Sequence, residues 1–93
     1  MVKMVINSNF GGFGCDVAEE FKYLIYQYRD DRFALELVKF VEEHPEDCGG
    51  LVVVGVCEGF TDYYIEEYDG SESVIYVLDG KIHWAEEIEE KGE

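Results

Sequence analysis

Basic residues are scarce in this sequence. Seven Lys and Arg stand against 22 Asp and Glu, so the formal net charge is -15 at pH 7. A surface this acidic repels nucleic acid and anionic membranes and attracts basic proteins. The charge therefore argues against direct binding to nucleic acid or to a membrane. It leaves two interpretations open, which are attraction of a basic partner protein and a surplus of carboxylates that only keeps the chain soluble.

Cysteine is also scarce, and its spacing excludes the common uses of cysteine clusters. Cys15, Cys48 and Cys57 form no C-x-x-C pair and have no group of histidines around them. Neither a disulfide framework nor a zinc site is expected, and the thiols are interpreted as reduced. Cys15 lies where a helix is expected to begin, a position that lowers the pKa of a thiol, but the neighbouring Asp16 opposes this effect.

Histidine is limited to His44 and His83, which stand apart in the sequence and are interpreted as structural. The chain offers no assembled set of nucleophile, base and orienting group. Its carboxylates do not follow the alternating spacing of an EF-hand, so bound calcium is not expected either. We therefore predict no catalytic residue, no metal and no cofactor, and we do not expect an enzyme.

Long apolar runs are absent. No stretch of 18 apolar residues occurs, and the N-terminus lacks an apolar segment followed by a small-residue cleavage site. We therefore expect neither secretion nor membrane insertion, and we place the chain in the cytoplasm. Because 93 residues support only one hydrophobic core, we expect a single α+β domain over residues 1–85 and an acidic tail over residues 86–93.

The hydrophobic pattern predicts an α+β fold in the order β-α-α-β-β-β-β. Short β-branched runs indicate strands, and apolar residues at intervals of three and four indicate two amphipathic helices. The first helix covers residues 16–29, and the second begins at Asp30 or Asp31 and is closed by Pro45. Asp79-Gly80 predicts a type I′ hairpin turn. Two helices should cover one face of a small, mostly antiparallel sheet. The expected strands cover residues 2–6, 51–57, 62–68, 73–78 and 81–84.

The stretch NFGGFGCDVAEE, residues 9–20, places three glycines before the first helix. Glycines let backbone N–H groups converge on an anion at a helix N-terminus, so this stretch could bind a ligand. Asp16 and Glu19 have capping-box spacing, however, and would satisfy those N–H groups with the protein's own carboxylates. We favour a tight strand-to-helix turn whose two phenylalanines pack in the core. The possible ligand loop comprises Asn9, Phe10, Gly11, Gly12, Phe13 and Gly14.

Carboxylates and tyrosines alternate in the segment DYYIEEYDGSE, residues 62–72. Rigid carboxylates interleaved with aromatic rings can imitate a phosphate backbone and supply strong contacts to a basic groove. The alternative is a solvated sheet face with tyrosines half buried at its edge, and the sequence leaves both open. The candidate partner-binding residues are Asp62, Tyr63, Tyr64, Glu66, Glu67, Tyr68, Asp69 and Glu72.

Three stretches together resemble a family of small phage and prophage proteins of unassigned function. They are INSNFGGFG near the start, LVKFVEEH in the middle and YYIEEYDGSES towards the end. The family is similar in its first strand, its aromatic Gly-Gly-Phe loop and its Tyr-Ile-Glu-Glu-Tyr-Asp-Gly segment. This chain departs from it at Gly14-Cys15 and in the closing VIYVLDGKIHW with its acidic tail. The resemblance implies a phage origin and supplies no catalytic residue.

Charge and resemblance together lead to three functional hypotheses. The first is a counter-defence inhibitor that acts in the cytoplasm of the host cell and occupies the basic nucleic-acid groove of a host nuclease or CRISPR effector by nucleic-acid mimicry. The second is a small-ligand binder, such as a sponge for a signalling nucleotide, that uses the Gly-rich loop. The third is a structural accessory protein that forms homo-oligomers through an edge strand.

Overall fold

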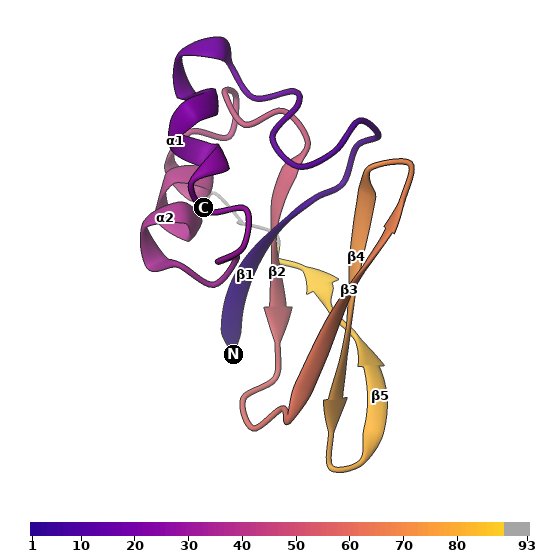
Figure 1. Ribbon diagram of the computed structural model, residues 1–93. Helices are drawn as coiled ribbons and strands as arrows, with labels where there is room; N and C mark the ends of the chain where they lie inside the picture. The colour runs from indigo at the N-terminus through magenta and orange to yellow at the C-terminus, as the bar shows by residue number, and fades with distance from the viewer. Residues whose placement is uncertain (89–93) are drawn as a thin grey trace.

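The computed structural model describes residues 1–88 and has an α+β fold, as the hydrophobic pattern predicts (Figure 1). Six strands and three helical segments follow one another along the chain. They are β1 (Val2–Asn7), the 3-10 helix η1 (Glu19–Phe21), α1 (Lys22–Tyr26), α2 (Leu35–Glu43), β2 (Leu51–Val56), β3 (Asp62–Tyr68), β4 (Ser71–Leu78), β5 (Lys81–Trp84) and β6 (Glu86–Glu87).

The strands form two three-stranded sheets, in the orders β1-β2-β6 and β3-β4-β5, and every pairing is antiparallel. The sequence pattern predicts one sheet, whereas in the structure the consecutive strands β2 and β3 are not paired and the two sheets meet at Ala85. This residue alone separates β5 from β6, and its N–H donates to the carbonyl of Val74 on β4 at 2.9 Å. The C-terminal strand segment therefore pairs first with β4 and then with β2, and so joins the two sheets at an angle (Figure 1).

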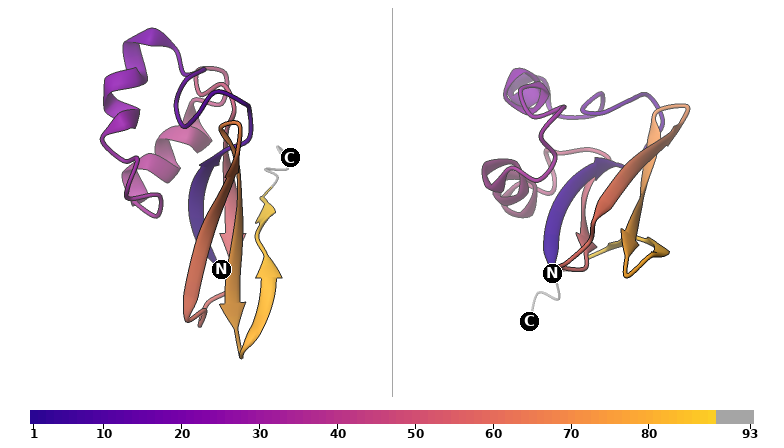
Figure 2. Two further views of the ribbon diagram at one scale, coloured as in Figure 1. Left: turned by 45° about the vertical axis from the view of Figure 1, so that its right-hand side comes forward. Right: turned by 60° about the horizontal axis from the view of Figure 1, so that its bottom comes forward.

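The β1-β2-β6 sheet lies between the helices and the second sheet (Figure 2). Side chains alternate along its strands, so Val5 and Val53 face the helices while Met4 and Val54 face the β3-β4-β5 sheet. All four are nearly or fully buried. Burial on both faces explains why β2 is the continuous apolar run LVVVGV rather than an alternating one.

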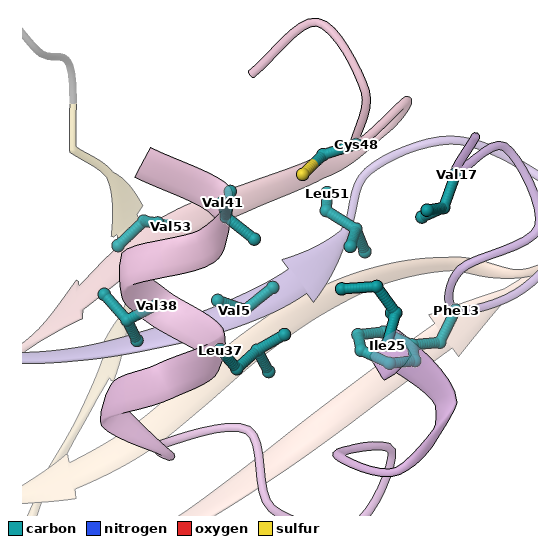
Figure 3. Packing of buried hydrophobic residues seen from close by; sticks show 10 residues of the cluster. All are labelled: Val5, Phe13, Val17, Ile25, Leu37, Val38, Val41, Cys48, Leu51 and Val53. Atoms are coloured by element: carbon teal, nitrogen blue, oxygen red, sulfur yellow. The ribbon is translucent and has the colours of Figure 1, made fainter. Parts of the chain in front are cut away.

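Helix α2 packs the apolar stripe predicted for it against this sheet. Leu37, Val38 and Val41 are buried, and Figure 3 shows them facing Val5 and Val53. The helix begins at Leu35, later than predicted. The residues before it form a turn in which the Ala34 N–H donates to the Asp31 carbonyl, so the N-cap residue is Ala34, whose methyl side chain cannot make a capping bond.

The predicted helix over residues 16–29 is much shorter in the structure. Only η1 and the five-residue α1 are helical, and residues 13–16 form turns. The capping box predicted for Asp16 and Glu19 is wrong. Ala18 is the N-cap residue of η1 and makes no side-chain capping bond, while Asp16 accepts a hydrogen bond from Asn9 Nδ2 at 3.1 Å.

The expected acidic tail begins as part of a sheet. Glu86 and Glu87 form β6 and pair with β2, and the N–H of Ile88 donates to the Val53 carbonyl at 2.8 Å. A domain boundary after residue 85 therefore does not match the strand pairing. Residues 89–93, the rest of the expected tail, lie outside the described residues.

Candidate functional site

The β3-β4-β5 sheet has one buried face and one open face. On the buried face Val74 and Tyr76 pack against Met4 and Val54 of the first sheet. Residues one position away along each strand point to the opposite side. We call that side the outer face. By the strand register, its residues are Asp62, Tyr64, Glu66, Tyr68, Ser71, Ser73, Ile75, Val77, Ile82 and Trp84.

A row of large side chains crosses the outer face. The register places Tyr64 on β3 opposite Ile75 on β4, and Ile75 opposite Trp84 on β5. Tyr64 is 57% exposed and Trp84 59% exposed, and Ile82 beside them is 69% exposed. Large apolar side chains gathered on one open face are typical of a surface that binds another protein.

Sequence reasoning missed Trp84 and Ile82, although a signal for both was present. Asp79-Gly80 predicts a two-residue hairpin turn, which sets Leu78 opposite Lys81, as the structure confirms. Counting outward from that turn places Trp84 opposite Ile75. The same count from the Asp69-Gly70 turn brings Tyr64 to the other side of Ile75.

Carboxylates border this row on β3. Asp62 accepts hydrogen bonds from the Tyr63 N–H at 2.9 Å and from the Tyr64 hydroxyl at 3.1 Å. The hydrogen bond to Asp62, together with its negative charge, raises the pKa of Tyr64. Within residues 1–88, neither Asp62 nor Glu66 forms an ion pair with a basic side chain. Both carboxylates are exposed at the edge of the outer face.

The candidate residues do not all share this face. Asp62, Tyr64, Glu66 and Tyr68 lie on the outer face, whereas Tyr63 and Glu67 point to the other side of the strand. Asp69 lies in the β3–β4 turn with a φ of 54°. The Tyr63 ring packs edge-to-face against Phe33 and Phe60, at centroid distances of 5.2 and 6.1 Å. Part of the predicted surface is therefore taken up by packing within the molecule.

Glu72, another of the candidate residues, forms a buried ion pair with Arg32. The two nitrogens of the guanidinium lie 2.7 and 2.9 Å from the two carboxylate oxygens, and both side chains are 8% exposed. Glu72 Oε1 also accepts a hydrogen bond from the Asn7 N–H at 2.8 Å. The expectation that Glu72 contributes to an open acidic surface is therefore wrong. Sequence reasoning also missed its partner Arg32, because nothing in the neighbourhood of either residue reveals a contact across 40 positions.

The Gly-rich loop is occupied by the protein's own β3–β4 turn. The N–H of Gly11 donates to the Asp69 carbonyl at 3.0 Å, and Asn7 Nδ2 donates to the Gly70 carbonyl at 2.9 Å. Gly70 approaches so closely that a Cβ on it would collide with the backbone nitrogens of Gly11 and Gly12. The glycines therefore have a structural use, since they let two segments of backbone meet.

The two phenylalanines of the loop have different environments. Phe13 is buried, as predicted, and its ring centroid lies 3.9 Å from the guanidinium carbon of Arg32. Phe10 is 65% exposed, so the expectation that it packs in the core is wrong. The loop turns back on itself after Gly12, where the Cys15 N–H donates to the Gly12 carbonyl, and this turn directs Phe13 inwards.

The cysteines differ in accessibility. Cys15 does not lie at a helix N-terminus as expected but in a turn before η1, where desolvation and the Asp16 carboxylate raise the pKa of its thiol. Burial and the Asp47 charge raise the pKa of Cys48 to about 11. We expect iodoacetamide at pH 8 to modify Cys48 at least about tenfold more slowly than Cys15, because Cys48 is 1% exposed and the thiolate is the reactive form. Peptide mass spectrometry over time measures both rates, and equal rates would contradict the burial of Cys48.

The described residues offer neither a group of metal ligands nor a helix that could span a membrane. Among residues 1–88, no three His, Cys, Asp or Glu side chains are grouped as metal ligands. No helix in this part of the chain has the length and apolar character needed to cross a membrane. Comparison with protein-family models, curated proteins and solved structures finds no match. The function must therefore be inferred from the chain's own surface.

Proposed function

We propose that this chain is a binding protein that docks through its outer face onto a basic surface of another protein. More specifically, we infer a phage-derived inhibitor in the host cytoplasm that occupies the nucleic-acid groove of a host nuclease or CRISPR effector. One observation carries the proposal: on the outer face, exposed Tyr64 and Trp84 lie on either side of the half-buried Ile75. Beside them are the carboxylates of Asp62 and Glu66, which form no ion pair within residues 1–88.

The two components of this surface have separate roles. Tyr and Trp are the residues most often found as energetic hot spots, because they bury a large area with few rotatable bonds. The carboxylates, within a chain of net charge -15, accelerate encounter with a Lys/Arg-lined groove and disfavour acidic competitors. Because β3 is held in a three-stranded sheet, its carboxylates project from fixed backbone positions and can be matched by cations of a groove.

The test uses two neighbouring glutamates that differ in the face they occupy. Glu66 lies on the outer face, whereas Glu67 points to the other side, and both are exposed. Either change to Lys alters the net charge equally. We expect Glu66→Lys to weaken partner binding at least about tenfold, as expected for reversal of a charge in a basic groove, and Glu67→Lys to weaken it much less.

The measurement is affinity capture from a host lysate with wild-type, Glu66→Lys and Glu67→Lys baits, followed by elution with rising salt and mass spectrometry. A nucleic-acid-binding protein that is retained by wild type and by Glu67→Lys, lost from Glu66→Lys and inhibited by the wild-type chain in its own cleavage assay supports the proposal. Equal capture by all three baits, or a captured protein whose activity is unchanged, contradicts it.

A further inference from the structure

We propose that β3 is a dimerisation strand, along which two copies of this chain pair antiparallel about a twofold axis at Ile65. The inference goes beyond the proposed function, because its partner is a second copy and its contact is the edge of the sheet rather than the outer face. It rests on the open edge of β3, on the direction of the backbone groups and on the order of charges along the strand.

The edge of β3 is open in the described structure. β3 is the first strand in the order β3-β4-β5, and all of its residues except Ile65 are exposed. The carbonyl of Val74 accepts the Ala85 N–H, so Val74 directs its backbone groups towards β5. Its cross-strand neighbour Ile65 therefore directs its own N–H and carbonyl away from β4. An exposed row of such groups is a template for another strand.

The residues of β3 are self-complementary about Ile65. When Ile65 lies opposite Ile65 of the second copy, Tyr64 lies opposite Glu66, Tyr63 opposite Glu67 and Asp62 opposite Tyr68. Every carboxylate then faces a tyrosine, and no carboxylate faces another. All seven residues of the strand are paired, and Ile65 is at the centre with its backbone groups directed at the partner.

Other positions of the axis are less favourable. An axis at Tyr64 places Asp62 opposite Glu66, and an axis at Glu66 or Glu67 places that carboxylate opposite itself. An axis at Tyr63 avoids these contacts but pairs only three residues of the strand. Since like charges directly opposite are destabilising, the charge order selects the register about Ile65.

Pairing in this register would double the proposed binding surface. Tyr64 and Glu66 both lie on the outer face, and they are opposite each other across the axis. The outer faces of the two copies would therefore lie on the same side of a continuous six-stranded sheet, with three strands from each copy. Two rows of Tyr64, Ile75 and Trp84 related by twofold symmetry fit an elongated groove better than one.

Salt separates self-association from binding to a basic partner. Two copies, each with a net charge of -15, repel each other, and this repulsion is screened over about 10 Å at 0.1 M salt. The dimer should therefore tighten as salt rises, whereas binding to a basic protein should weaken. Failure of one proposal thus leaves the other standing.

The experiment is sedimentation equilibrium of the full chain at about 0.05 and 0.5 M salt, with two opposite substitutions at one position. The dimer contains two symmetry-related contacts between residue 64 of one copy and Glu66 of the other. Tyr64→Lys places a cation opposite Glu66 in both contacts, whereas Tyr64→Glu places a carboxylate opposite it in both. We expect the dissociation constant of the Lys variant to be at least about tenfold lower than that of the Glu variant. Ile82→Lys and Ile82→Glu are matched controls, because Ile82 lies on the same face but on β5, at the opposite edge of the sheet from β3.

A second measurement, made on the wild-type chain, does not depend on the folding of any variant. Hydrogen exchange at the Ile65 amide should slow at least about fivefold as the protein concentration rises through the dissociation constant. A monomer at every salt and concentration would overturn the proposal. The proposal would also be overturned if the dissociation constants of the Lys and Glu variants differed no more at Tyr64 than at Ile82. Hydrogen exchange at the Ile65 amide that is independent of protein concentration would overturn it as well.

Discussion

We expect the replacement of Arg32 by Met to lower the free energy of unfolding by about 3–5 kcal/mol. The change leaves the Glu72 carboxylate buried without its counter-charge, because it removes the two guanidinium nitrogens at 2.7 and 2.9 Å and leaves the neutral Asn7 N–H at 2.8 Å. It also removes the stacking of the guanidinium on Phe13 and the hydrogen bond that Arg32 Nε donates to the Arg29 carbonyl at 2.6 Å. Chemical denaturation monitored by circular dichroism measures the loss.

The double variant Arg32→Met with Glu72→Met separates the cost of a lone buried charge from the worth of the pair. Apolar groups of similar volume in place of both partners should recover most of the lost stability, because no buried charge remains unpaired. The exposed pair of Lys22 and Glu19, at 3.6 Å, gives the matched surface control. Lys22→Met should change stability by less than about 1 kcal/mol. A similar small loss at Arg32 would contradict the burial of the pair.

This ion pair also determines where the candidate surface can be. Arg32 lies before α2, and Glu72 lies at the start of β4, next to the β3–β4 turn. Their contact attaches that hairpin to the segment before α2, and the hydrogen bond from the Asn7 N–H attaches the same carboxylate to β1 of the first sheet. The buried carboxylate is therefore part of the frame that holds the outer face in place.

Features defined by local chemistry could be predicted from the sequence. Asp79-Gly80 was expected to form a type I′ turn, and both residues have positive φ values, 54° and 76°. The apolar residues of α2 recur at helical intervals and are buried as expected, because a helix of nine residues is long enough for this periodicity to be visible in the sequence. The strand assigned to LVVVGV is β2. In each case the signal lies within a few residues of the feature.

Features that depend on distant segments could not be predicted in the same way. The apolar stripe that predicts a helix over residues 16–29 includes Val17. This side chain is buried, but its backbone is not helical, because the Gly-rich loop before it bends around the β3–β4 hairpin. The sequence around Glu72 indicates a surface carboxylate like its neighbours, although its partner Arg32 lies 40 residues away. The third strand of the first sheet, β6, likewise depends on a distant segment: its two residues carry no strand signal of their own, and they pair with β2, which lies much earlier in the sequence.

Replacing Gly70 by Ala costs more stability than the same replacement at Gly80. Both glycines are the second residue of an Asp-Gly turn, with φ values of 91° and 76°, so both substitutions incur a strain of about 1–2 kcal/mol. An added Cβ at Gly80 has no atom within 4 Å, whereas one at Gly70 would overlap the backbone of Gly11 and Gly12. We expect a loss of about 1–2 kcal/mol at Gly80 and about 3–4 kcal/mol at Gly70, measured by chemical denaturation.

The difference between the two variants isolates the contact between the hairpin and the Gly-rich loop, because the backbone strain is common to both. If the two variants lose equal stability, the Gly-rich loop does not contact the β3–β4 turn, and Gly11 and Gly12 are available for another use such as ligand binding. If Gly70→Ala costs more, the glycines are needed for that close approach. The loop then acts on the candidate surface indirectly, by fixing the end of the hairpin that carries Tyr64 and Glu66.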